Sequence, residues 1–178
     1  LSMGERRLMA HWMLNMYLNT HDKILATEKP HDRFAQTAEN TQRRDMNAIS
    51  MARALAGLIM ETRLGEMEFD PYRVDDATGS DRTFYAQVAD VKIKRGMADT
   101  VKNALNVTSD SWITRYKSLL NLPDEIWVIA DTHDWAERRL RLLLELPEDQ
   151  QIKAAQNDWN TDQIQMVLDQ INDANGGD

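Results

Sequence analysis

The sequence predicts an all-α protein, and two observations carry this prediction. Four prolines and seven glycines among 178 residues leave long stretches without a helix breaker. Apolar side chains also recur at three- and four-residue intervals, as on the buried face of an amphipathic helix. We therefore expect a multi-helix domain whose helices are mostly short.

The spacing places a series of helices along the chain. A long one is predicted after Asn47, a residue type that caps helix N-termini, and carries Met51, Leu55, Leu58 and Ile59 on one face. The other expected helices lie around Phe34–Glu39, at Phe84–Ile93, Met97–Leu105 and Ser109–Leu120, from Pro123, after an Asp134 cap, at Pro147–Ala155, and after a Thr161 cap.

The stretch 84–93 fits two structures. Tyr85 and Val88 are spaced as in a helix, whereas the alternation of Val91 and Ile93 with polar residues is typical of a strand. Of the two, we favour the helix.

Composition excludes several kinds of site. The absence of cysteine excludes disulfides, thiolate zinc sites and cysteine nucleophiles. The sequence has no apolar run long enough to cross a bilayer and no signal-peptide pattern, so we expect a cytoplasmic protein that does not enter the membrane. The four histidines lie mostly in polar connections rather than at the helical spacings of a metal site.

The charge is distributed unevenly. The chain carries a net charge of −8, which argues against a nucleic-acid partner. Between residues 91 and 122, however, six basic residues face only two acidic ones, Asp99 and Asp110. Such a local excess indicates either an anion-binding face or ordinary solvated surface.

Residues 97–122 follow the plan of a helix-turn-helix. A first helix meets a turn at Asn106-Val107-Thr108, and a second helix begins at Ser109. In this motif the second helix enters the DNA major groove, although a buried helical hairpin has a similar pattern. The residues expected to contact DNA are Lys102, Thr108, Ser109, Asp110, Ser111, Thr114, Arg115 and Lys117.

Five segments strengthen the DNA interpretation. Residues 106–123, NVTSDSWITRYKSLLNLP, resemble the recognition helix of the ParB family of partition proteins, and residues 135–147, WAERRLRLLLELP, resemble that family's next supporting helix. Upstream, GERRLMA at 4–10 and ENTQRRDMN at 39–47 resemble two further family motifs, and residues 157–171 resemble the helix that closes the central domain. The segments occur in the family's order.

The resemblance implies a ParB-type central domain and further contacts. Arg138 and Arg139 would join the DNA-binding set. The family binds CTP through its upstream motifs, which implies a nucleotide site at Gly4, Glu5, Arg6, Arg7, Asn40 and Arg43, with Mg²⁺ at Glu39 and Asn40. It also implies a homodimer on palindromic double-stranded DNA, a ParA-type ATPase partner, and association with a bacterial nucleoid or plasmid. Enzymatic activity would be at most slow CTP hydrolysis by a full-length protein, and we expect none from this chain.

Three departures from the family pattern affect these expectations, one of which is that we expect the family's C-terminal dimerisation module to be absent. The strands that precede the first motif in the family are missing, so we expect residues 1–46 to be a remnant of the nucleotide-binding region, residues 47–174 to form the DNA-binding domain, and residues 175–178 to be a disordered tail. An insertion at about 66–95 separates the long helix from the DNA-binding motif. Two alternatives stay open: a CTP-dependent switch with a degenerate DNA module, and a helical protein-interaction module that uses an exposed Trp112.

Overall fold

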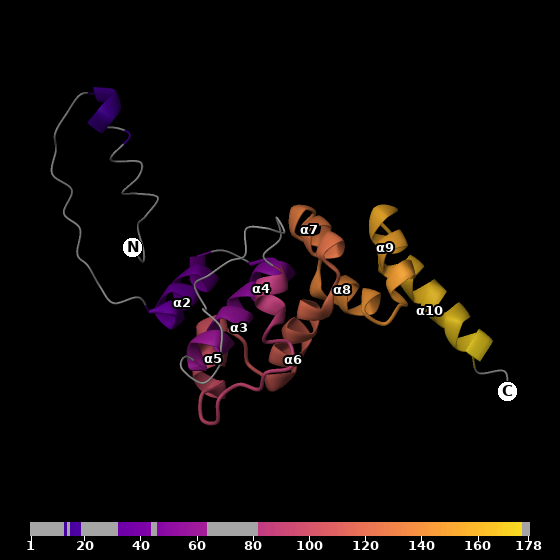
Figure 1. The fold of residues 1–178 in the computed structure, drawn as a ribbon, viewed down its shortest axis with the longest axis horizontal. Coiled ribbons are helices and arrows are strands. Elements are labelled where there is room, and N and C mark those ends of the chain that lie inside the picture. The colour runs from indigo at the N-terminus through magenta and orange to yellow at the C-terminus, as the bar shows by residue number, and fades with distance from the viewer. Residues whose placement is uncertain (1–12, 14, 19–31, 44–45, 64–81, 176–178) are drawn as a thin grey trace.

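The computed structural model describes residues 13, 15–18, 32–43, 46–63 and 82–175, and its helices form the body shown in Figure 1. Within these ranges every regular element is a helix, which confirms the all-α prediction. The elements are α2 (Arg33–Arg43), α3 (Ala48–Thr62), α4 (Arg82–Ala86), α5 (Ala98–Leu105), α6 (Asp110–Ser118), the 3₁₀ helix η2 (Leu119–Asn121), α7 (Asp124–Thr132), α8 (Glu137–Leu143), α9 (Glu148–Gln156) and α10 (Thr161–Asn175).

Helix α3 lies at the centre of the core. It packs against α2, α4, α5, α6 and α7, so it is covered on several sides. Asn47 caps its first turn as predicted, because its side-chain oxygen accepts a hydrogen bond from the Ser50 N–H at 2.7 Å. The α3 side chains with no exposed surface are Ile49, Ala52, Leu55, Ala56, Leu58, Ile59 and Met60.

Beyond this core the chain continues as α8, α9 and α10, which extend to the opposite end of the body from α2 (Figure 1). Helix α8 contacts both α6 and α10, and α9 contacts α7. Trp127 of α7 and Leu140 of α8 are fully buried, so the core runs on into this half without a break.

Three helices, α5, α7 and α9, end in the same way. An Asn or Asp in the left-handed conformation follows each, and the N–H of the next residue donates to a carbonyl oxygen of the last helical turn at 2.9 to 3.0 Å. These pairs are Asn106 and Val107, Asp134 and Trp135, and Asp158 and Trp159. Asn and Asp adopt this conformation more readily than other non-glycine residues, so the chain reverses tightly without glycine.

Two predicted helix N-caps are wrong, because other residues cap those helices. Asp134 has a φ of 56° and belongs to the turn that closes α7, so Ala136 takes the N-cap position of α8. Before α10 the cap is Asn160 rather than Thr161. Asn160 and Gln163 exchange two hydrogen bonds between side chain and backbone, at 2.8 and 2.9 Å, as in a capping box.

The predicted helix at 84–93 is also wrong over its second half. Helix α4 ends at Ala86, and turn and bend residues at 87–90 then lead to an irregular segment at 91–94. In this segment Val91 and Ile93 are half-buried whereas Lys92 and Lys94 are exposed. Val91 and Ile93 therefore pack against the core while the two lysines lie at the surface, which is the alternation noted in the sequence.

Helix α2 packs against α5 and α3. Thr41 marks this contact, since its hydroxyl donates to the Ala104 carbonyl oxygen at the end of α5. Within the described ranges, no helix is long and apolar enough to cross a bilayer.

A polar network joins the start of α3 to the end of α7. The Asp131 carboxylate accepts hydrogen bonds from Arg53 at 2.7 Å and from the Asn47 side chain at 3.1 Å. Burial acts to raise the pKa of Asp131, but the hydrogen bonds from Arg53 and Asn47 and the charge of Arg53 outweigh it, so the pKa lies below its usual value.

We predict that Asp131→Asn lowers the free energy of unfolding at pH 7 by about 1 kcal/mol, a value reduced for the partial exposure of the pair. Because the folded-state pKa is depressed, this contribution is fully present above the unfolded pKa of about 3.9 and is lost as the pH falls through the folded value. Urea unfolding between pH 3 and 8 checks this. The exposed Asp173→Asn is the control, and a wild-type advantage that stays constant down to pH 3 would contradict the prediction.

Candidate nucleic-acid interface

The predicted helix, turn and helix at 97–122 are present as α5, a short connection and α6 with η2. Helices α5 and α6 contact each other, and both pack on α3. Asn106 takes the left-handed conformation, with φ 53°, and Val107 is half-buried below it. Ser109 is extended and precedes the first turn of α6. The left-handed Asn106 and the extended Ser109 therefore define the two ends of the connection between α5 and α6.

The sequence of α6 separates it into two faces. Trp112, Ile113 and Tyr116 point inward, where Ile113 is buried and the two aromatic rings stack at 5.5 Å. The outward residues recur one turn apart, as helical periodicity requires, and are exposed or half-exposed. They are Asp110, Ser111, Thr114, Arg115, Lys117 and Ser118.

Hydroxyl groups run along the middle of the outer face of α6. Thr114 donates to the Asp110 carbonyl oxygen at 3.2 Å, and Ser118 donates to the Arg115 carbonyl oxygen at 2.7 Å. The hydroxyls of Ser109 and Ser111 lie 2.8 Å apart and share a hydrogen bond. Each hydroxyl oxygen keeps acceptor capacity, so this face can both donate and accept hydrogen bonds.

Two cations lie on opposite flanks of these hydroxyls. Arg115 lies beside the Trp112 ring, with its guanidinium carbon 5.7 Å from the ring centroid, and has no acidic partner among the described residues. Lys117 is half-buried, and this burial lowers its pKa, with Asp90 opposing the shift and the like charge of Lys92 adding to it. Both residues were predicted as DNA contacts, and the fold brings them to one face.

Lys102 is held between two carboxylates. Its ammonium lies 2.8 Å from the Asp99 carboxylate and 3.1 Å from the Asp110 carboxylate. The ion pair with Asp110 links α5 to the first turn of α6. The hydrogen bonds to Asp99 and Asp110 raise the pKa of Lys102, so it stays charged. The two carboxylates and one ammonium carry a net negative charge, so this cluster adds no positive charge to that of Arg115 and Lys117 on α6.

The predicted arginines of α8 have different surroundings. Arg139 stacks on Trp135, with its guanidinium carbon 3.5 Å from the ring centroid, and bonds Asp158 at 2.9 Å. It thus joins α8 to the turn between α9 and α10. Arg138 is exposed and forms no ion pair within the described part of the chain.

The predicted nucleotide and metal residues lie largely beyond the structural description. Gly4, Glu5, Arg6 and Arg7 fall outside the described residues, as does the side chain of Arg43. On α2, Glu39 is half-buried and Asn40 is exposed. Among the residues that the structure describes, no group of three or more His, Asp or Glu is placed to hold a metal ion.

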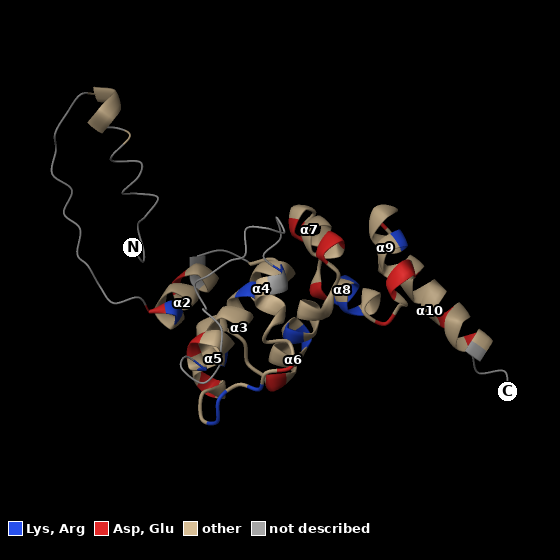
Figure 2. Ribbon diagram, in the orientation of Figure 1, with Lys and Arg blue, Asp and Glu red and all other residues tan. Residues whose placement is uncertain are grey.

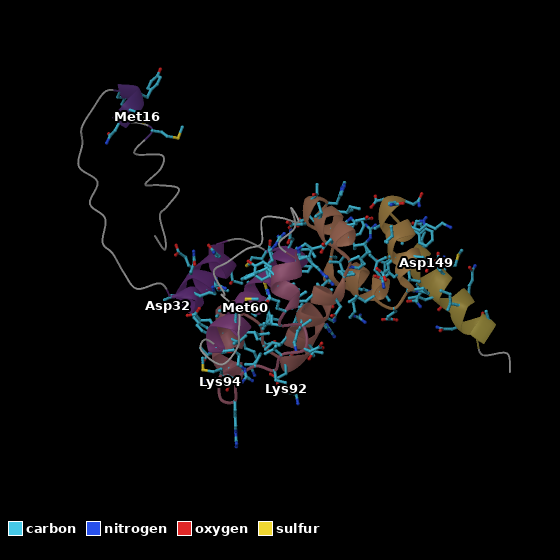
Figure 3. All side chains as sticks on the ribbon, in the orientation of Figure 1. Met16, Asp32, Met60, Lys92, Lys94 and Asp149 are labelled. Atoms are coloured by element: carbon cyan, nitrogen blue, oxygen red, sulfur yellow. The ribbon has the colours of Figure 1, made fainter. Side chains whose placement is uncertain are left out.

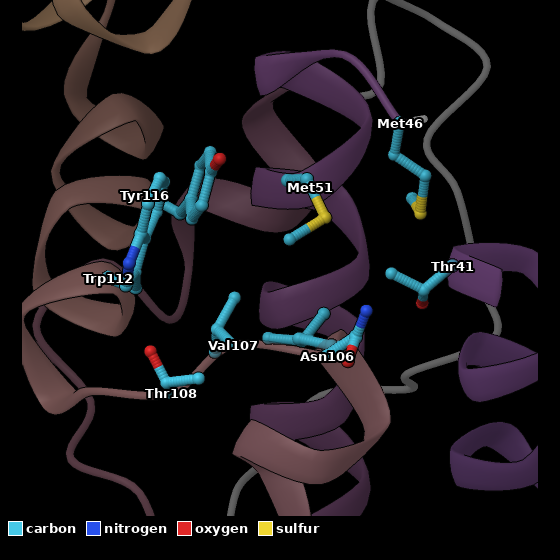
Figure 4. A pocket seen from close by; sticks show the side chains of 9 residues that line it. Thr41, Met46, Met51, Asn106, Val107, Thr108, Trp112 and Tyr116 are labelled. Atoms are coloured by element: carbon cyan, nitrogen blue, oxygen red, sulfur yellow. The ribbon is translucent and has the colours of Figure 1, made fainter. Parts of the chain in front are cut away.

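A shallow cleft of about 360 Å³ lies beside the connection between α5 and α6 (Figure 4). Its lining comes from α2, α3, the connection and the inner face of α6. Trp112 and Tyr116 form one wall, Met46 and Met51 lie opposite, and Thr108 lies at the rim (Figure 4). Trp112 is therefore half-buried beside Tyr116, whereas the protein-interaction alternative uses an exposed Trp112.

Sequence reasoning missed one group of cations. Lys92, Lys94 and Arg95 were counted in the local charge excess but not assigned to a site. They are exposed on the loop that leads into α5, at the lower edge of the body (Figures 2 and 3). The clue was the alternation around Val91 and Ile93, which implies that the intervening lysines face solvent.

Comparisons of the chain with protein-family models, with curated proteins and with solved structures find no match. The residues of the interface therefore carry the functional argument.

The ion pairs of Lys102 allow two roles to be told apart, the neutralisation of Asp110 and a direct contact with phosphate. If the protein binds DNA and Lys102 neutralises Asp110, we expect Lys102→Gln to weaken that binding by exposing phosphate to the Asp110 carboxylate, and the added substitution Asp110→Asn to restore affinity. Fluorescence anisotropy with a labelled duplex measures both variants. A loss that persists in the double variant would show that Lys102 contacts phosphate itself.

Proposed function

We propose that this protein binds double-stranded DNA in a sequence-specific manner, as a ParB-type protein of chromosome or plasmid partition. Helices α5 and α6 act as a helix-turn-helix, and α6 enters the major groove. The observation that carries the proposal is the outer face of α6, where Ser111, Thr114 and Ser118 lie between the cations Arg115 and Lys117.

The chemistry of this face suits a base-reading surface. Hydroxyls can donate to or accept from base edges, and an Arg fork matches the acceptor pair of guanine. Cations on both flanks suit a groove that is bordered by phosphates on both sides. A single α-helix also has about the width of the major groove, roughly 12 Å.

The packing behind α6 supports the same function. Ile113 and Leu120 anchor α6 in the core, and α3 and α8 lie behind it, so the helix is held as a rigid rod. Tyr116 extends this support: burial, and then the charge of Glu137, raise the pKa of Tyr116, which places its phenol near α8. Rigid presentation lowers the entropic cost of binding.

The half-burial of Trp112 favours DNA binding over the protein-interaction alternative. A projecting aromatic anchor is what such a module would require, whereas Trp112 stacks on Tyr116.

The resemblance to ParB extends the proposal to regulation and partners. CTP and Mg²⁺ would bind through the motifs at 4–7 and 39–43, and the protein would act as a cytoplasmic homodimer with a ParA-type ATPase. The switch alternative differs in one respect, because it predicts CTP-dependent protection from unfolding without binding to DNA.

Selection from a random duplex pool at two salt concentrations tests the proposal. We expect a palindromic sequence to be enriched, with affinity that falls steeply as salt rises. Arg115→Gln should cost about 1–3 kcal/mol on the selected sequence and relax its preference, whereas Lys117→Gln should weaken all sequences equally. Lys153→Gln on α9 removes the same charge away from α6 and serves as the control. Failure to enrich any sequence, together with salt-independent retention, would refute the proposal.

A further inference from the structure

The shallow cleft beside the connection between α5 and α6 has walls of two kinds that face each other. Trp112 and Tyr116 of α6 form one wall, and their rings stack with a centroid distance of 5.5 Å. Met46 and Met51 lie on the opposite side (Figure 4). An aromatic face and a thioether both make favourable contacts with the ring of a ligand. The two walls therefore suit a flat aromatic molecule.

Trp112 keeps surface that a ligand can cover. Tyr116 packs directly against the buried core, whereas Trp112 stacks on Tyr116 and lies beside the Arg115 guanidinium. In this position Trp112 is only half-buried. A ligand that covers more of its ring removes further apolar surface from water, and this removal favours binding.

The lining of the cleft selects against charged ligands. Among the described residues, the lining includes no Asp, Glu, Lys, Arg or His. Burial raises the pKa of Tyr116, so its phenol stays neutral at physiological pH. A charged ligand would lose hydration in this cleft without gaining an ionic partner from the lining, and that loss is costly. The occupant that fits the lining is therefore uncharged.

Polar groups of three lining residues can orient an uncharged ligand. Asn106 and Thr108 belong to the connection and are exposed, and each side chain can both donate and accept hydrogen bonds. The Thr41 hydroxyl already donates to the Ala104 carbonyl oxygen at 3.0 Å, so towards a ligand it can only accept. The volume of about 360 Å³ lies in the range of small-molecule sites, roughly 300–1,000 Å³.

We infer that this cleft binds a small, planar, uncharged aromatic molecule with a hydroxyl or amide group at its edge. The ring lies against Trp112 and Tyr116 on one side and the two methionines on the other, and the polar edge faces the connection. Because the lining comes from α2, α3, the connection and α6, a bound ligand contacts all four and stabilises the folded state. The inference does not rest on the proposed DNA binding, since neither the site nor its test requires DNA.

The test uses 2-naphthol, which is planar, uncharged at neutral pH and carries one hydroxyl. Decahydro-2-naphthol is the control, because it has the same carbon skeleton and hydroxyl without aromatic rings. We expect 2-naphthol to bind with a Kd on the order of 0.1–1 mM and the saturated alcohol to bind about 5-fold more weakly. In a nitrogen–proton NMR spectrum, the indole N–H signal of Trp112 should move on titration, and those of Trp127, Trp135 and Trp159 should not.

Two variants change opposite walls of the cleft. Trp112→Leu removes the aromatic face and should weaken binding of 2-naphthol about 3- to 10-fold in calorimetry. The loss of one indole signal in this variant also assigns the Trp112 resonance. Met46→Ala removes a thioether from the other wall and should weaken binding about 2- to 5-fold.

Trp159→Leu is the matched control for Trp112→Leu, because it makes the same substitution at another half-buried tryptophan, just before α10. It should leave the affinity for 2-naphthol unchanged. Circular dichroism verifies that each variant is folded. If Trp112→Leu does not fold, the wild-type NMR titration and Met46→Ala decide the matter.

Three results would overturn the inference. A Trp112 signal that stays in place at mM concentrations of 2-naphthol would show that the cleft is not a binding site. Equal affinity for the saturated alcohol, or for all variants, would exclude recognition of an aromatic ring by these walls. A Trp112 signal that moves with protein concentration alone would assign the cleft to a second copy of the chain. Each of these failures leaves the proposed role of the outer face of α6 in DNA binding unaffected.

Discussion

Burial of α3 determines how the rest of the protein is arranged. Ile49, Leu55, Leu58 and Ile59 are fully enclosed, so this helix must be surrounded by α2 and α4–α7. Each such side chain contributes about 1.5–3 kcal/mol when buried, whereas an exposed ion pair contributes about 0–1 kcal/mol. Packing around α3, rather than surface charge pairs, therefore fixes the orientation of α6. Because α3 covers one face of α6 only, the other face, with its hydroxyls and cations, is left to solvent.

The proposed binding of an anionic partner by this acidic protein depends on where its cations lie. Lys102 and Arg139 form ion pairs that join neighbouring elements. Carboxylates of the protein itself therefore neutralise much of their charge. Arg115 is instead exposed on the outer face of α6, where the half-buried Lys117 flanks the same hydroxyls. Local charge, not the net charge of −8, sets the potential that an approaching phosphate meets. The acidic remainder of the surface would oppose DNA in other orientations, which favours a single mode of binding.

Periodicity predicted the helices well because their buried faces are continuous, and it predicted the Asn47 cap because that cap depends on local sequence. The caps at Asp134 and Thr161 were wrong because the left-handed backbone at Asp134 and the reciprocal bonds of Asn160 and Gln163 decide where those helices begin. The outer face of α6 could be predicted from one helix alone. The partners of Lys102 and Arg139 and the position of residues 91–96 could not, because residues distant in sequence determine them.

Site-directed DNA cleavage tests the central claim, that the outer face of α6 enters the major groove, most directly. The chain has no cysteine, so Thr114→Cys gives one attachment point for an iron chelate on this face, and Lys153→Cys gives a matched point on α9. We expect the Thr114 conjugate to cut bound duplex at a few adjacent positions, with the strand offset of major-groove cleavage, and the Lys153 conjugate not to do so. Equal cutting by both conjugates, or cutting from Lys153 alone, would contradict it.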